Sequence, residues 1–118
     1  MNHASEPMLL RIYTDENANI GDRRLIDEIV RRARATGLAG ATVLRGSNGF
    51  GRRKGPLHEH HSLGLGDNMP LVVEIVDDEP ALRAFAGSLR GLRHVGLVTL
   101  ERVEVLATSI EEEGNRDA

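Results

Sequence analysis

Apolar residues follow two periods along this chain, and the shorter period predicts four strands. In the first of these segments, MLLRIYT, Leu10 and Ile12 fall on one side and Arg11 on the other, which is the alternation of a half-buried strand. A later segment, LVVEIV, is apolar on both sides except at Glu74, as is typical of a central strand. The predicted strands span residues 8–14, 39–45, 71–76 and 97–106.

The longer period, about 3.6 residues, predicts two helices, one after the first strand and one after the third. The first helix is expected to begin near Asp22, a good N-cap, after a polar connection over residues 15–21. The second is expected to begin at Asp77 or Asp78 and to end at Gly91. The apolar stripes that define the two helices are Leu25, Ile26, Ile29, Val30 and Ala33, then Leu82, Phe85 and Leu89.

This order of elements predicts an α+β fold of the ferredoxin-like type. Two right-handed βαβ halves give a βαββαβ sandwich, in which a four-stranded antiparallel sheet carries both helices on one face. The expected strand order is 4-1-3-2, so the first and third strands are neighbours. A long connection, residues 46–70, joins the second and third strands.

The face of the sheet without helices is predicted to be partly apolar and partly charged. It should present Tyr13 with Arg11 from the first strand and Glu74 from the third, so that Arg11 and Glu74 can pair across the sheet. This mixture favours a subunit interface, which we expect to include Arg11, Tyr13 and Glu74. A plainly solvated face is the alternative.

Three arginines, Arg31, Arg32 and Arg34, fall in the last turns of the first predicted helix. Cations at a helix C-terminus oppose the helix dipole, and this solvent-side role explains the cluster better than a nucleic-acid patch does. The formal net charge of the 118 residues is −3, which gives no further reason to expect nucleic-acid binding.

The long connection begins with GSNGFG, which follows Arg45 and precedes Arg52, Arg53 and Lys54. Glycines bring backbone N–H groups close to an anion, and guanidinium groups bind phosphate in a bidentate manner. No helix is predicted after these glycines, so the motif is neither a dinucleotide fingerprint nor a P-loop. A phosphate-bearing ligand is one interpretation. The other is that the glycines provide flexibility and the cations solubility.

The same connection contains HEHH, with His58, His60 and His61 around Glu59. Alternate residues of an extended segment share a side, so His58 and His60 alone could bind one metal ion, and further ligands are lacking. We therefore expect no metal site. No constellation of nucleophile, base or paired carboxylates stands out in the chain, and we expect no enzymatic activity.

Length and composition indicate one domain over residues 1–118, with flexible tails at 1–7 and 108–118. The chain has no cysteine, which excludes disulfides and thiolate metal sites. No apolar run is long enough to span a bilayer, and the N-terminus lacks the pattern of a signal peptide. The expected location is the cytoplasm, without insertion into a membrane.

Four segments, LLRIYT, RRARATGLAGATVLRGSNGFG, MPLVVEIVDDEP and GLVTLERVEV, are spread over residues 8–106, nearly the whole length of the chain. In these segments it resembles a PII-like (GlnB-like) bacterial family of unknown function, related to the nitrogen regulatory PII signal-transduction proteins. The resemblance implies a homotrimer packed through the uncovered sheet faces and a T-loop in the connection after the second strand. PII proteins bind adenine nucleotides between subunits near the base of that loop, and present the loop to transporters or enzymes.

The resemblance also implies which residues bind the nucleotide or another anionic metabolite. These are Arg45, Gly46, Gly49, Phe50, Gly51, Arg52 and Arg53. The loop tyrosine that PII proteins modify has no counterpart, since Tyr13 is the only tyrosine. Residues 91–96 (GLRHVG) stand where PII has a phosphate-binding turn but match it poorly. The expected function is a trimeric regulator of a transporter or enzyme; a small enzyme for a phosphorylated substrate and a ligand-free adaptor are the alternatives.

Overall fold

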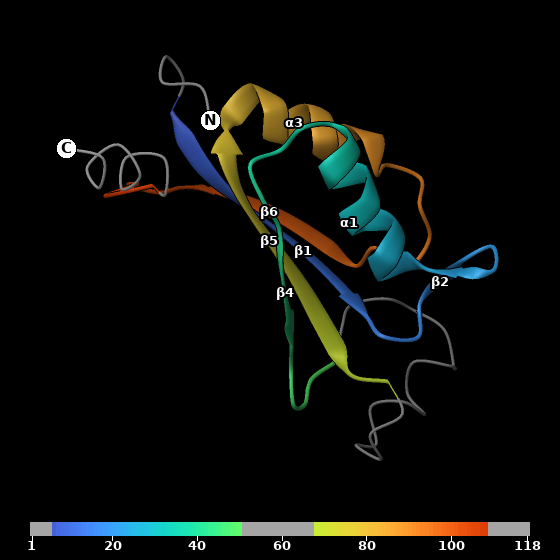
Figure 1. The fold of residues 1–118 in the computed structure, drawn as a ribbon. Helices are drawn as coiled ribbons and strands as arrows, with labels where there is room; N and C mark the ends of the chain where they lie inside the picture. Colours follow the sequence, from blue (N-terminus) through green and yellow to red (C-terminus); the bar gives the residue numbers. More distant parts are fainter. Residues whose placement is uncertain (1–5, 51–67, 109–118) are drawn as a thin grey trace, which may run out of the picture.

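A computed structural model describes residues 6–50 and 68–108 of the chain (Figure 1). Two strands, β1 and β5, are the longest and form the middle of the sheet. The elements in chain order are β1 (Pro7–Asp15), β2 (Asn19–Ile20), β3 (Arg23–Arg24), α1 (Leu25–Ala35), β4 (Thr42–Arg45), β5 (Pro70–Asp78), α3 (Glu79–Ser88) and β6 (Leu97–Arg102). No helix within residues 6–50 and 68–108 is both long and apolar enough to cross a membrane.

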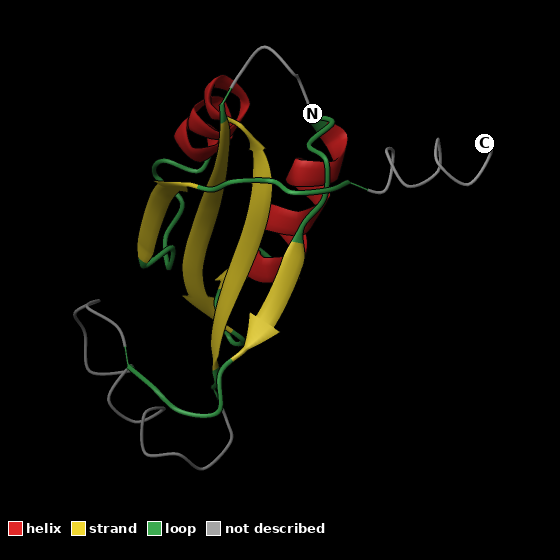
Figure 2. Ribbon diagram, turned by 90° about the vertical axis from the view of Figure 1, so that its left-hand side faces the viewer, coloured by secondary structure: helices red, strands yellow, loops and turns green. Residues whose placement is uncertain are grey.

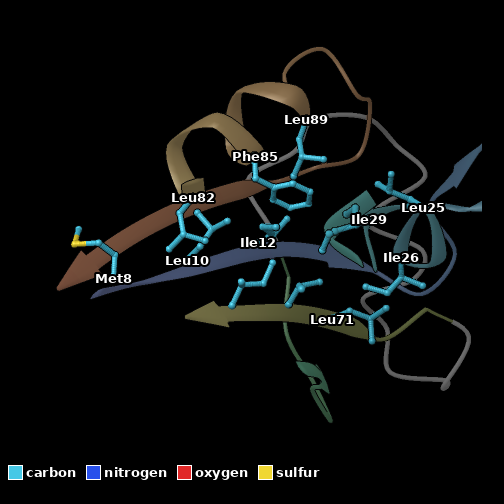
Figure 3. Packing of buried hydrophobic residues seen from close by; sticks show 14 residues of the cluster. Met8, Leu10, Ile12, Leu25, Ile26, Ile29, Leu71, Leu82, Phe85 and Leu89 are labelled. Atoms are coloured by element: carbon cyan, nitrogen blue, oxygen red, sulfur yellow. The ribbon is translucent and has the colours of Figure 1, made fainter. Parts of the chain in front are cut away.

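The main sheet has four antiparallel strands in the order β4-β5-β1-β6. If β1, β4, β5 and β6 are numbered 1 to 4 along the chain, the order read from the β6 edge is 4-1-3-2, as predicted. Both helices lie on one side of the sheet (Figures 1 and 3). The structure is therefore an α+β fold consistent with the ferredoxin-like arrangement. In Figure 2 the strands pass in front of the helices, so the uncovered face is turned toward the reader.

The core lies between the sheet and the two helices (Figure 3). Along β1 and β5 every second side chain is buried, because successive residues of a strand point to opposite faces. Leu10 and Ile12 of β1 meet Leu25 and Ile29 of α1 and Phe85 of α3 in this layer. The predicted alternation and both helical stripes are confirmed, except that Val30 is only half-buried.

The segment before α1 differs from the prediction. Residues 19–20 and 23–24 pair as a small hairpin, β2–β3, with Gly21 in its turn at a φ of 63°. The chain therefore stays extended until Arg24, and Leu25 N–H donates to Ala18 O at 2.8 Å. Asp22 was wrongly predicted as the N-cap, since it lies in the hairpin, and Arg24 occupies that position without a side-chain cap.

The start of α3 follows the prediction, and several element ends do not. Asp78 is the N-cap and accepts a hydrogen bond from Ala81 N at 3.1 Å. The helix ends at Ser88, and Gly91, with a φ of 89°, lies in the turn beyond it. Strand β4 begins late, at Thr42, because Ala39 N–H donates to the Asp77 carboxylate and not to a neighbouring strand.

Strand β6 is four residues shorter than the predicted segment 97–106. Its partner β1 begins at Pro7, and Arg102 pairs with Met8 near that end. Residues 104–107 therefore pair with no strand among the described residues, and they continue as an irregular segment.

Candidate functional site

The base of the long loop is fixed to one end of the main sheet, where β1 and β4 end and β5 begins. Gly46 N–H donates to Pro70 O at 2.8 Å, which joins the two ends of the loop. Glu16 N–H donates to Met69 O at 3.0 Å, which attaches the residue after β1 to the same place. The predicted loop therefore begins and ends on a rigid support.

Two of the predicted glycines have a structural reason to be glycine. A Cβ atom added to Gly46 would lie 2.8 Å from Cγ of Pro70, closer than side-chain atoms normally approach. Gly49 has a φ of +155°, which side-chain-bearing residues rarely adopt, and its N–H donates to Oδ1 of Asn48 at 2.8 Å. The glycines at the loop base thus permit a close turn, whether or not they also approach a ligand.

Arg45 presents its guanidinium group at this loop base, and it already binds a carboxylate. Its Nε donates to Oε2 of Glu16 at 2.5 Å, and this hydrogen bond lowers the pKa of Glu16. The side chain of Arg45 remains 57% exposed. An incoming anion would therefore bind the remaining N–H groups of Arg45 or compete with Glu16. Glu16 was missed from the sequence, because it lies 29 positions away in a different predicted element.

The other predicted ligand-binding residues are placed only in part. The side chain of Phe50 is almost fully exposed, at 92%. Gly51, Arg52 and Arg53 lie outside the described residues, as do the histidines of HEHH. Among the described residues, no group of three metal-ligating side chains gathers. The structure thus brings together Arg45, Gly46 and Gly49 at the loop base, and leaves the remaining assignments as predictions.

The turn over residues 91–96 lies at the same end of the sheet as the loop base, but at its β6 side. Thr14 Oγ1 donates to the His94 carbonyl at 2.8 Å, and Gly96 N–H donates to Tyr13 O at 2.8 Å. Strand order places β5 and β1 between β4, which carries Arg45, and β6, which follows this turn. In one subunit, the loop base and the turn are therefore separated by the two central strands.

The uncovered face of the sheet carries the predicted ion pair. Arg11 and Glu74 are direct cross-strand partners, and Nε of Arg11 donates to Oε2 of Glu74 at 3.0 Å. Arg11 also binds Glu101 of β6, a partner that we did not predict. The hydrogen bond to Glu74, followed by the one to Glu101, raises the pKa of Arg11. Half-buried apolar side chains surround this cluster: Leu9, Tyr13, Val72 and Val76.

Two of the arginines near the end of α1, Arg31 and Arg32, have a role that we did not predict, whereas Arg34 is exposed in the last turn, as predicted. Glu28 is buried, with 8% of its side chain exposed, and three arginines bind it. Arg31 donates through Nε at 3.0 Å and Nη2 at 2.8 Å, Arg32 through Nε at 2.7 Å, and Arg23 of β3 through Nη1 at 3.1 Å. The hydrogen bonds from Arg31 and then Arg32 lower the pKa of Glu28 to about 2.

These contacts correct the solvent-side interpretation for Arg31 and Arg32. Arg31 and Arg32 neutralise a buried carboxylate, and Nη1 of Arg32 also donates to the Ser88 carbonyl of α3 at 3.1 Å. The cluster therefore links β3, α1 and α3. The spacings from Glu28 to Arg31 and Arg32, three and four residues, were visible in the sequence as helical pairs. The burial of Glu28 was not.

Comparison with known proteins gives a family without an established activity. The DUF190 family, described as "Uncharacterized ACR, COG1993", matches residues 7–105. Two proteins of Aquifex aeolicus (strain VF5), each described as "UPF0166 protein", are similar to the chain. One is 39% identical over 98 residues, which cover 83% of this chain and 91% of the relative. The other is 31% identical over 98 residues, which cover 83% and 95%.

Proposed function

The chain belongs to the DUF190 family of uncharacterised proteins, and on that premise we propose that it is a PII-like trimeric regulator in the cytoplasm. Its loop base binds an anionic metabolite, with adenine nucleotides as the first candidates. The long loop then changes its order and alters the surface offered to a partner protein, such as a transporter or an enzyme.

The observation that carries this proposal is the anchored loop base. A switch needs a rigid end at which a ligand acts and a segment that responds. The hydrogen bonds of Gly46 and Glu16 to the β5 end supply the rigid end. Arg45 places a half-exposed guanidinium group there, and Arg52 and Arg53 follow it closely in the sequence. Guanidinium groups beside glycine backbone suit a phosphate group.

The uncovered sheet face supports the trimer. Its apolar side chains surround the ion cluster of Arg11, Glu74 and Glu101, and such a mixture is typical of interfaces between subunits. Packing of subunits also bears on the ligand site. Because the loop base and the turn over 91–96 lie at opposite sides of the same sheet end, neighbouring subunits would bring the turn of one close to the loop of the next. Arg90 and Arg93, both exposed, flank that approach.

The test combines thermal stability with particle mass. We expect ATP, ADP or AMP to raise the melting temperature of the protein, inorganic phosphate to raise it less, and light scattering to give three chains per particle. The double variant Arg52→Ala/Arg53→Ala should bind the nucleotide about ten- to a hundredfold more weakly and remain a trimer, because charge-assisted contacts are lost.

A matched variant controls for the loss of charge. Arg34→Ala/Arg83→Ala removes the same number of positive charges, but from the helices, and should bind the nucleotide like the parent. A trimer without any nucleotide response would favour the ligand-free adaptor. A monomer at micromolar concentration would contradict the regulator in the form proposed. Equal weakening by both double variants would show that only net charge matters.

A further inference from the structure

The residues after β6 form an arm, residues 103–108, and its part from Glu104 to Ala107 has no partner strand among the described residues. Val103 N–H reaches Pro7 O at 3.4 Å, and from Glu104 to Ala107 no backbone hydrogen bond is seen within the described part of the chain. The sequence VEVLAT is that of a strand, yet Val105 is 36% and Leu106 85% exposed. Figure 1 shows this arm leading away from the helices, and in Figure 2 it passes in front of the strands.

The opposite edge of the sheet is formed by β4, which pairs with β5 only. All four of its residues are exposed, and two are large and apolar: Val43 at 41% and Leu44 at 47%. The register assigns each to a face. Val43 lies opposite Val73, which is buried under the helices, and Leu44 lies opposite Val72 on the uncovered face. Edge strands that stay in water are commonly blunted by charge or proline, and the middle of β4 has neither.

A groove of about 550 Å³ runs between α1 and β4, on the helix side of this open edge. Its apolar lining consists of Ile26, Val30, Val43 and Leu71. Leu71 and Ile26 belong to the buried core, so the groove is an incomplete margin of that core. A strand added beside β4 would project every second side chain into it.

We propose that the arm of one subunit pairs with the β4 edge of a second copy of this chain. Val103, Val105 and Ala107 share one face of an extended arm, and they would enter the groove beside Val43. Glu104 and Leu106 share the other face, where Leu106 would cover Leu44. The arm and the edge each present apolar side chains to both faces, and this match favours a second copy over an unrelated partner.

A subunit cannot satisfy its own edge in this way. Strand β6, from which the arm continues, and β4 lie at opposite edges of the sheet, with β5 and β1 between them. In Figure 2 the arm runs across the strands on the uncovered side of the sheet, and it does not align alongside β4. The inference rests on the self-association proposed above, and it adds the contact that orders β4. Since β4 ends at Arg45, the neighbouring arm would hold the strand that carries the loop base.

Disulfide formation tests the pairing directly, because the chain has no cysteine of its own. Disulfides need Cα atoms within about 7 Å of each other. The variant Val43→Cys/Val105→Cys should give covalent dimers and trimers under mild oxidation, seen on a non-reducing gel. The matched control Val43→Cys/Leu106→Cys places the second cysteine one residue later, on the opposite face. Leu106 is more exposed than Val105, so random collision would favour the control.

Each outcome is decisive once reduced samples of both variants melt like the parent. Faster cross-linking between chains at Val105 than at Leu106 supports the arm pairing and its face assignment. Particles of three chains in which the two variants cross-link equally, or not at all, overturn the pairing and leave the trimer standing. A disulfide within single chains overturns the second-copy assignment. Monomeric particles without cross-links contradict both the pairing and the proposed trimer.

Discussion

Two clusters of arginine and carboxylate lie on either side of the sheet, and they differ in ratio and in burial. On the helix side, three arginines bind the buried carboxylate of Glu28, an excess of two positive charges. On the uncovered side, Arg11 alone forms ion pairs with both Glu74 and Glu101, which leaves an excess of one negative charge. The side chains of Arg11 and Glu74 remain 33% and 30% exposed.

The difference separates an ion cluster that completes the fold from one that remains open to a partner. A buried carboxylate without a cation would lose its hydration with no compensation, so Glu28 makes its arginines structural. The uncovered cluster is still reached by water, which weakens its ion pairs within one subunit. Covering that face with another subunit would exclude this water and strengthen the same contacts. The ratio of arginines to carboxylates and the exposure of the side chains therefore indicate that the Glu28 cluster stabilises the single chain, and that the Arg11 cluster can bind another subunit.

The largest effect is expected from removing the charge of Glu28. Glu28→Gln keeps the size of the side chain but leaves Arg23, Arg31 and Arg32 facing one another without a carboxylate. The melting temperature should fall by several degrees, measured by calorimetry. The matched change Asp27→Asn removes an exposed carboxylate from the same helical turn and should have little effect. Equal effects of the two changes would contradict a special role for the buried cluster.

Acid should remove the same contribution without mutation. The pKa of Glu28 is lowered from 4.5 to about 2 in the folded protein, so its stabilising contribution is complete above pH 4.5. As the pH falls from 4.5 toward 2, Glu28 of the unfolded chain takes up a proton before Glu28 of the folded protein does, which favours unfolding, and the contribution is lost. The stability difference between parent and Glu28→Gln should therefore shrink over this range, in urea unfolding at each pH. A difference that stays constant to pH 2 would contradict the lowered pKa.

Substitution of Arg11 in the uncovered cluster is expected to affect the stability of the single chain less than Glu28→Gln does, and to affect subunit assembly more. Arg11→Glu would place three carboxylates together, and their repulsion should prevent subunits from packing on this face. Light scattering should then show smaller particles than the parent gives, while circular dichroism shows the same secondary structure. Arg11→Lys keeps the charge and should assemble more nearly like the parent. Unchanged assembly of Arg11→Glu would place the interface elsewhere.

The comparison also shows what the sequence could predict. The Arg11–Glu74 pair followed from strand alternation and sheet order, because both residues lie on central strands in fixed register. The Glu28 cluster did not follow, although its helical spacings were visible. Arg23 reaches Glu28 only because an unpredicted hairpin turns the chain back before α1. Local propensity does not contain such contacts, which depend on how separate elements pack.

At the loop base, too, some features could be predicted from the sequence and others could not. Its position after the second strand of the main sheet and its glycines were predicted, and a close approach to Pro70 explains Gly46. The partner of Arg45 was not predicted, because Glu16 follows β1 and meets Arg45 only through the order of strands in the sheet. A pairing between residues at the ends of different strands has no period that a single sequence can reveal.

The smallest effect on the fold, and the sharpest test of the loop base, is expected at Glu16. Its ion pair with Arg45 is exposed, so Glu16→Gln should change the melting temperature little. If Arg45 serves an anionic ligand, Glu16 competes for it, and removing this charge should strengthen nucleotide binding several-fold in titration calorimetry. Arg45→Gln should weaken binding whether or not Glu16 is present. The double variant should bind the nucleotide with the same affinity as Arg45→Gln alone. Without Arg45, Glu16 and the ligand no longer compete for the same guanidinium group, so removing Glu16 has no further effect. If Glu16→Gln strengthens binding equally with and without Arg45, the carboxylate acts only through overall charge and not through this ion pair.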